Sequence, residues 1–146
     1  MREALREAEK AFREDEVPVG AVIVYKGKII ARGHNQVERL KDSTAHAEIL
    51  AITSASNSLG TKWLLDTAIY VTIEPCSMCA GALVLSRIKN LYFGAKDPKT
   101  GACGSVTNIV NNKKLNHRIK VAKGILAAES SSLLKEFFKK KRVAND

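Results

Sequence analysis

The segment EPCSMCAG, residues 74–81, places Cys76 and Cys79 three positions apart, directly after a proline. Two thiols at this spacing can form a redox pair, hold a metal ion, or pack in the core of the protein. Proline suits the first turn of a helix, because its missing N–H group would have no partner there. We therefore predict that Pro75 and both cysteines lie in the opening turn of a helix, where positions i and i+3 share one face.

A second segment, STAHAEIL, supplies a histidine that can complete a metal site with these cysteines. We predict a helix here, with His46 in its first turn and Ser43 or Thr44 as its N-cap. Helices that follow strands of one sheet can direct their N-termini into the same crevice at the strand ends. His46, Cys76 and Cys79 then give three protein ligands, the number typical of a catalytic zinc ion whose fourth position is left to water.

Glu48 lies two residues after His46 and is not needed as a ligand. Beside a zinc ion that lowers the pKa of its bound water toward ~7, such a carboxylate can act as the base for that water. A glutamate or histidine alone on a helix is usually a structural or surface residue, and a single C-x-x-C pair is ambiguous. H-x-E followed by P-C-x-x-C is far more specific, and is the signature of zinc-dependent deaminases.

The elements that must position these residues alternate along the chain. A sheet with helices on both faces is the usual result of strands alternating with helices. The segment TAIYVTI is too apolar for an edge strand, and residues 97–116 have the composition of a loop. We predict strands at 17–25, 28–35, 67–73, 90–95 and 117–125, the first two joined in a hairpin at Lys26 and Gly27. We predict helices at 1–12, 45–56, 79–88 and 126–142, the third of them preceded by the turn that carries Pro75 and Cys76.

Length and composition favour a single domain over residues 1–146. With 146 residues and 45% hydrophobic residues, the chain can bury a core without disulfides or metal ions. Three cysteines cannot all pair, which indicates a reducing compartment such as the cytoplasm. No segment approaches the roughly 18 to 20 consecutive apolar residues of a membrane span, so no membrane association is expected.

The positive charge is concentrated in the C-terminal third. The formal net charge is +9, and residues 113–142 contain ten Lys or Arg against only Glu129 and Glu136. A basic block of this kind favours a polyanion such as nucleic acid. A solvated helix end is an equally good explanation from charge alone.

The sequence resembles the bacterial tRNA-specific adenosine deaminases of the cytidine deaminase-like superfamily over nearly its whole length. Beyond the zinc motif, the resemblance is carried by EVPVGAVIV, GHN, FGAKDPKTGACGS, LNHRI and LLKEFFKKKR. It implies an α/β fold, a three-layer α/β/α sandwich around a mixed five-stranded sheet. It also implies a homodimer with one Zn²⁺ per subunit that converts the wobble adenosine of a tRNA anticodon stem-loop to inosine.

The resemblance also implies contacts with the substrate. Asn35 matches a position that contacts the base, although a turn residue is the simpler explanation of an asparagine there. Asp97 matches a loop acid beside the nucleotide backbone, and Val17 is expected to line the substrate pocket. The backbone N–H of Ala47, at a helix N-terminus, is an expected donor near the reacting centre. Glu74 is expected to support the site without taking part in the chemistry.

The segment FFKKKR combines aromatic rings and cations on the predicted last helix. We expect it to bind RNA through phosphate contacts and stacking. Its aromatic residues can alternatively pack on the core, which is the commoner fate of such rings. The expected RNA-binding residues are Phe137, Lys139, Lys140, Lys141 and Arg142.

Three other functions remain open from the sequence. A free-base or nucleoside deaminase, acting on guanine or on cytosine or cytidine, would share every zinc residue but would not need the basic C-terminal third. A non-catalytic RNA-binding protein with a structural zinc ion would normally supply four ligands. A thiol redox protein would leave His46 and Glu48 unused. Cys103 is interpreted as a free thiol without a catalytic role.

Overall fold

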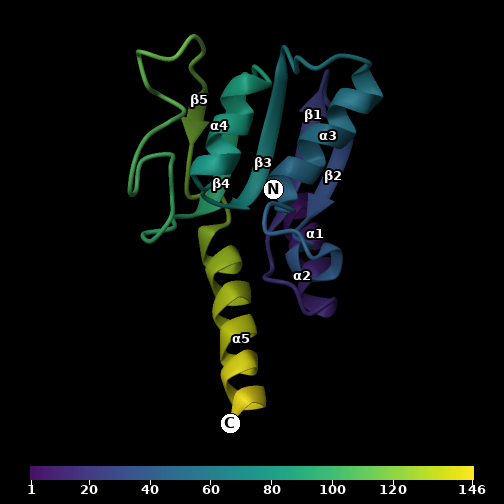
Figure 1. Ribbon diagram of the computed structural model, residues 1–146, viewed down its shortest axis with the longest axis vertical. Coiled ribbons are helices and arrows are strands. Elements are labelled where there is room, and N and C mark those ends of the chain that lie inside the picture. The colour runs from purple at the N-terminus through teal and green to yellow at the C-terminus, as the bar shows by residue number, and fades with distance from the viewer.

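Five strands and five helices make up the computed structural model, which describes residues 1–146 (Figure 1). Each predicted strand and helix is present, and one short helix, α2, was not predicted. The elements are α1 (Arg2–Arg13), β1 (Gly20–Tyr25), β2 (Lys28–His34), α2 (Val37–Leu40), α3 (Ala47–Leu59), β3 (Thr67–Ile73), α4 (Ser77–Leu85), β4 (Asn90–Ala95), β5 (Lys120–Ala122) and α5 (Ala127–Asn145).

The strands form one mixed sheet in the order β2-β1-β3-β4-β5. β1 pairs antiparallel with β2 and β3, whereas β3, β4 and β5 are mutually parallel. β3 is the central strand, which agrees with the prediction that its sequence is too apolar for an edge strand. Because β2, β3 and β4 run in one direction, they all end at one edge of the sheet, which we call the C-terminal edge. The opposite edge carries the β1–β2 turn and the first residues of β3, β4 and β5.

Helices cover both faces of the sheet, which confirms the predicted three-layer α/β/α arrangement. α3 and α4 lie on one face, and α1 lies on the other. The start of α5 packs against β4, and the rest of this helix extends beyond the strands (Figure 1). Two glycines allow the closest approaches. A Cβ atom on Gly20 would collide with Ala4 and Ala8 of α1, and one on Gly33 would collide with Ala47 and Ala51 of α3.

The main core lies between the sheet and the helices α3 and α4. Ala47, Ala51 and Ala55 of α3 are fully buried and recur every four residues, so one small-residue face of the helix meets the strands. Larger side chains from the sheet and from α4 fill the space beside them: Ile23, Ile69, Val71, Leu83, Leu91 and Phe93. This packing fixes the N-terminus of α3 at the C-terminal edge of the sheet.

Residues 97–116 contain no named helix or strand, as predicted. The last strand is shorter than the predicted range 117–125, because only Lys120–Ala122 pair with β4. No helix has the length and apolar character needed to cross a membrane.

Candidate metal and catalytic site

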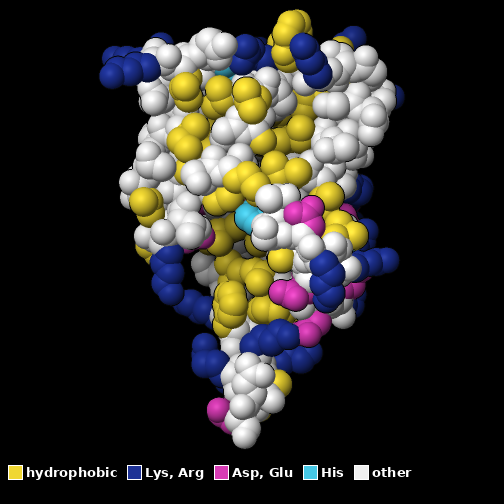
Figure 2. All heavy atoms as spheres, viewed as in Figure 1, with side chains coloured by type: hydrophobic (Ala, Val, Ile, Leu, Met, Phe, Trp, Pro, Cys, Tyr) yellow, Lys and Arg dark blue, Asp and Glu magenta, His cyan; other side chains and the backbone are white.

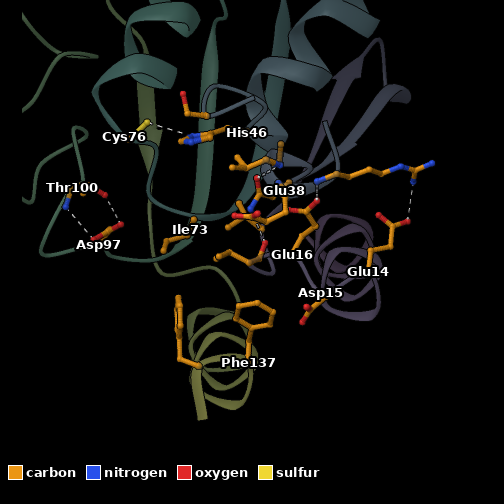
Figure 3. Close-up of a pocket in the computed structure, with 18 of the residues that line it drawn as sticks. Glu14, Asp15, Glu16, Glu38, His46, Ile73, Cys76, Asp97, Thr100 and Phe137 are labelled. Atoms are coloured by element: carbon orange, nitrogen blue, oxygen red, sulfur yellow. Dashed lines mark hydrogen bonds and ion pairs between the residues drawn. The ribbon is translucent and has the colours of Figure 1, made fainter. Parts of the chain in front are cut away.

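His46, Cys76 and Cys79 come together at the C-terminal edge of the sheet. The Nδ1 atom of His46 lies 3.6 Å from the Cys76 sulfur and 3.5 Å from the Cys79 sulfur. All three ligand atoms lie within 4.8 Å of one another. Figure 3 shows His46 and Cys76 facing each other at one end of a pocket. The residues that the sequence selected as a metal site therefore share one site in space.

The cysteines lie at the N-terminus of α4, but Cys76 precedes the first turn in which it was predicted. Cys76 is the N-cap, with extended backbone angles of φ −74° and ψ 177°. Cys79 lies in the first turn of the helix. The prediction that Pro75 belongs to the first turn is wrong, because Pro75 precedes the cap and its carbonyl accepts the Ala102 N–H at 2.9 Å. This bond joins the loop before α4, which carries Cys76, to the segment that follows β4.

His46 also differs from its predicted place by one step. It is itself the N-cap of α3, with φ −75° and ψ 153°, and it makes no side-chain capping bond. The predicted caps Ser43 and Thr44 are therefore wrong. The Thr44 hydroxyl instead donates to Asp42 at 2.7 Å, within a turn that precedes the helix. An extended backbone at both caps directs the two side chains toward one point between the helix ends.

The separations between the ligand atoms fit a zinc ion. Zinc binds histidine nitrogen at about 2.0–2.1 Å and cysteine sulfur at about 2.3 Å with tetrahedral angles. In that geometry a nitrogen and a sulfur on one ion lie about 3.5–3.6 Å apart. The two N···S distances, 3.5 and 3.6 Å, match this value. One nitrogen and two sulfur donors are also ligands that suit zinc.

The two thiols differ in acidity because they interact with each other. Hydrogen bonds with Cys79 and with His46 lower the pKa of Cys76 to about 4. The hydrogen bond with Cys76, followed by burial, raises the pKa of Cys79. The hydrogen bond with Cys76 raises the pKa of His46. A bound dication would outweigh the repulsion between the sulfurs and favour two thiolates with a neutral imidazole.

Glu48 lies beside this cluster, on the first turn of α3. Its residue surface is 3% exposed, and its side chain reaches the same cavity as His46 and Cys76. Burial raises the pKa of its carboxyl group. A buried carboxyl group with a raised pKa can hold and release a proton near neutral pH, which is the property required of a general acid and base.

A cavity of about 950 Å³ opens beside the cluster. In Figure 2 one histidine side chain is visible at the hollow in the middle of the molecule. The predicted substrate residues and two of the predicted RNA-binding residues line this cavity, whereas Lys139, Lys140 and Arg142 do not. The predicted residues that line it are Val17, Asn35, His46, Ala47, Glu48, Cys76, Asp97, Phe137 and Lys141.

Asn35 is held by the segment that precedes β1. Its side-chain amide donates to the Val17 carbonyl at 3.2 Å, and its carbonyl oxygen accepts the Val37 N–H at 3.4 Å.

Glu16, which sequence reasoning missed, stabilises the same region. Its carboxylate, on a residue only 1% exposed, accepts the N–H groups of Glu38 and Arg39 at 2.9 and 2.8 Å. A glutamate before V-P-V gave no local signal of these partners, which lie 22 and 23 positions away.

Glu74 ties the end of β3 to the loop after β4. Its carboxylate accepts the N–H groups of Asp97, Cys103 and Ser105 at 3.1, 3.0 and 3.1 Å, and also the Ser105 hydroxyl. Gly101 packs so closely that a Cβ atom there would collide with this carboxyl group. Burial raises the pKa of Glu74, but its hydrogen bonds outweigh burial and hold the pKa below 4.5. The loop carrying Asp97 and the loop carrying Cys76 are therefore fixed to one anion.

We expect Glu74→Gln to destabilise the protein by about 2 kcal/mol, because hydrogen bonds to a charged group are lost. Since the folded pKa lies below 4.5, the wild-type protein loses this contribution as pH falls below that value. The stability of the variant should therefore depend less on pH in that range. Thermal unfolding at pH 7 and at pH 3.5 measures both effects. The exposed Glu129→Gln is the control, and an equal loss in both variants would contradict the assigned role.

The C-terminal half of α5 forms the wall of the cavity farthest from the cysteines (Figure 3). Phe137 is 4% exposed and packs edge-on against Phe12, with ring centroids 5.8 Å apart. Phe138 is 45% exposed and also lines the cavity. Lys141 forms an ion pair with Asp15 at 2.6 Å, which connects α5 to the segment after α1. Of the two aromatic rings, Phe138 is the more accessible to a partner.

Comparisons of sequence agree on one kind of protein. Residues 1–142 match the family model described as MafB19-like deaminase. The chain is 55% identical over 142 residues to the tRNA-specific adenosine deaminase of Aquifex aeolicus (strain VF5), covering 97% of this chain and 93% of the other. It is 48% identical to the tRNA-specific adenosine deaminase of Bacillus subtilis (strain 168), covering 97% and 88%.

Comparisons of structure give the same fold. One solved chain, from a study of A-to-I editing by tRNA:A34 deaminases at the wobble position of transfer RNA, superposes with a TM-score of 0.89. It is 45% identical, and the match covers 92% of this chain and 97% of the other. A guanine deaminase from Nitrosomonas europaea superposes with a TM-score of 0.80 at 28% identity, covering 92% and 80%.

Proposed function

Because this chain belongs to the deaminase family and to its tRNA-specific adenosine deaminases, we propose that it converts the wobble adenosine of a tRNA anticodon to inosine. The reaction is a hydrolysis that replaces the amino group on C6 of adenine with oxygen and releases ammonia. The observation that carries the proposal is the cluster of His46, Cys76 and Cys79, with Glu48 beside it, in a cavity walled by a cationic helix.

We propose that His46, Cys76 and Cys79 hold one zinc ion per subunit. The separations between the three ligand atoms support this assignment. When bound, zinc lowers the pKa of a water in its fourth position toward ~7, so that water becomes a nucleophile at neutral pH. The three ligands lie at the N-termini of α3 and α4. Because both helices pack on the sheet, the sheet fixes the arrangement of the ligands.

Glu48 is proposed to move the protons. Its carboxylate takes a proton from the attacking water and delivers it to N1 of adenine while oxygen bonds to C6. It then takes the proton of the new C6 hydroxyl group and delivers it to the amino group, which leaves as ammonia. Burial keeps its pKa raised, so the same group can serve in both steps.

Four further residues are proposed to hold the nucleotide. Asn35 and Val17 lie together on one wall of the cavity, and the amide of Asn35 is oriented by its bond to Val17. The backbone N–H of Ala47 lies at the N-terminus of α3, where helix donors have no partner within the helix. Asp97 lies on the opposite wall, in the loop that Glu74 orders.

A direct assay tests the proposed function. The zinc-loaded protein is incubated with unmodified tRNA that has adenosine at the wobble position, and with free adenosine, cytidine and guanine, and inosine or ammonia is measured. We expect product from the tRNA alone. Deamination of a free base or nucleoside without activity on tRNA would replace the proposal with a free-base or nucleoside deaminase.

The cations near the end of α5 are proposed to bind the anticodon stem-loop. We expect simultaneous replacement of Lys139, Lys140, Lys141 and Arg142 by Gln to weaken stem-loop binding. The slope of log affinity against log salt should fall by about 3, since each lost phosphate contact removes about 0.7–0.9. Titrations at several salt concentrations measure the slope. An unchanged slope, with zinc content as in the wild type, would show that these cations are only solvated.

The remaining expectations concern assembly and location. We propose a homodimer, and an exposed apolar surface over α4 supports it (Figure 2). Leu85 is 75% exposed, and Trp63 and Leu65, next to the C-terminal end of α4, are 46% and 57% exposed.

We also propose a single deaminase domain, supported by the match over residues 1–142. Thiol ligands must stay reduced, which supports a cytoplasmic location.

A further inference from the structure

The basic residues of the C-terminal third form two separate surfaces in the structure, although the sequence presents them as one block. The cations of α5 lie beyond the C-terminal edge of the sheet, where α5 projects away from the strands (Figure 1). The cations before β5 lie at the opposite edge, because β5 begins there beside the start of β4. The proposed function uses only the first surface.

The second group, which we call the distal basic surface, continues across the whole opposite edge. Register places Lys28 beside Tyr25, Tyr25 beside Thr67, and Lys120 beside Asn90, so this edge runs from β2 to β5. Loop contacts bring further cations to the same edge. The surface consists of Lys26, Lys28, Lys62, Arg87, Lys89, Lys113, Lys114, Arg118 and Lys120.

Hydrogen bonds fix the β4–β5 half of this surface. The Lys120 N–H donates to the Lys89 carbonyl at 3.1 Å. The Arg87 guanidinium donates to Asn116 at 3.2 Å, and the His117 ring contacts the Ile88 carbonyl at 2.7 Å. The loop between β4 and β5 is therefore held against the C-terminal end of α4. Its lysines, Lys113 and Lys114, are exposed and precede the exposed Arg118 and Lys120 along the chain.

Almost no negative charge offsets these cations. Asp66 is the one acidic residue of the edge, and it contacts Lys89 only at 4.0 Å. Residues 98–128 contain no Asp or Glu. In Figure 2 Lys and Arg side chains surround the upper end of the molecule, and no acidic side chain is visible there. A surface that needed charge only for solubility would not require acids to be excluded, because mixed charges serve that purpose.

The distal basic surface lies too far from the cavity to act on it through space. β3 crosses the sheet between them, and its seven residues span about 20 Å at roughly 3.3 Å per residue. Charges in water are screened over about 8 Å at physiological ionic strength. These cations therefore contribute little to the potential at the metal site. Their effect on a substrate requires direct contact with a molecule large enough to reach both places.

Resting on the proposed function, we propose that the distal basic surface binds phosphates of the tRNA outside the anticodon stem-loop. A tRNA whose wobble nucleotide occupies the cavity is a polyanion that extends far beyond 20 Å. Neutralised phosphates release counterions, and this gain is independent of sequence. The surface would thus increase affinity for whole tRNA without contributing to the choice of the edited base.

Two RNAs and two matched variants test this proposal. The distal variant replaces Lys113, Lys114 and Lys120 with Gln, and the control variant replaces the exposed Arg2, Arg6 and Arg13 of α1 with Gln. Binding of labelled full-length tRNA and of the isolated anticodon stem-loop to each zinc-loaded protein is titrated at several salt concentrations. We expect the distal variant to lower the log–log salt slope for full-length tRNA by about 2–3. Its slope for the stem-loop should equal that of the wild type, and the control variant should change neither slope.

An unchanged slope for full-length tRNA would overturn the proposal, and so would an equal decrease for both RNAs. Binding and deamination are measured separately, so failure of this proposal can be distinguished from failure of the proposed function. If the wild-type protein deaminates neither RNA, the proposed function fails. The salt slopes still show whether the distal basic surface contacts the body of the tRNA.

Discussion

The Glu48→Ala variant is expected to lose at least ~100-fold of its deamination rate while it retains one zinc ion per chain, because general acid–base catalysis contributes about this much. Glu48 is not one of the three residues whose ligand atoms cluster, so its removal should leave the proposed zinc ligands in place. The carboxyl group is buried, and burial raises its pKa. Alanine removes the group that is proposed to move protons but keeps a strong helix former in the first turn of α3.

Single-turnover rates with tRNA, measured beside zinc content and thermal unfolding, separate chemistry from folding. Glu48→Gln is the matched variant, since it keeps the size of the side chain but cannot accept the proton of the attacking water. Both variants should bind tRNA as the wild type does. Near wild-type rates in either variant would assign the proton transfers to another group.

Cys79→Ser is expected to bind zinc far more weakly and to show no measurable activity. Removing one of three ligands should cost more than the ~10- to 100-fold in metal affinity that loss of a supporting residue costs. The fold should persist, because it is stabilised by a hydrophobic core cluster of 19 buried residues. Elemental analysis after dialysis, with circular dichroism on the same sample, measures both expectations.

Cys103 provides the matched control for this experiment. It is a free, buried thiol, and burial raises its pKa to about 12. It does not belong to the cluster of ligand atoms, so Cys103→Ala should keep its zinc. Equal zinc loss in the Cys79 and Cys103 variants would point to a general loosening of the structure and would contradict the ligand assignment.

The fold and the metal cluster followed from local patterns in the sequence. Strand and helix periodicities predicted the sheet and its layers, and the cytidine deaminase-like fold implied by the resemblance is confirmed. The two short motifs that contain His46, Glu48, Cys76 and Cys79 were enough to predict the site. Each motif begins a helix, and the N-termini of the two helices meet at one sheet edge. Their exact caps were predicted wrongly because a cap depends on the backbone angles of one residue. The Asp42 carboxylate, which accepts the N–H and hydroxyl groups of Thr44, lies outside the predicted helix.

Glu74 was expected to support the site and Glu16 was missed, but the partners of neither carboxylate could be predicted in the same way. Glu16 accepts N–H groups of α2, and Glu74 accepts N–H groups of a loop up to 31 positions away. No residue type near either glutamate indicates these partners, because backbone N–H groups occur in almost every residue. The division of the basic block into two surfaces likewise depends on where β5 enters the sheet. Only the tertiary structure contains that information.

The contacts between α5 and the first 15 residues can form only after almost the whole chain has been synthesised. The ion pair of Lys141 with Asp15 joins residues 126 positions apart, and Phe137 packs on Phe12 nearby. His46, Cys76 and Cys79 are synthesised long before this wall of the cavity exists. A nascent chain can thus assemble the ligand cluster early, yet it lacks a complete substrate pocket until its last helix has been translated and has docked.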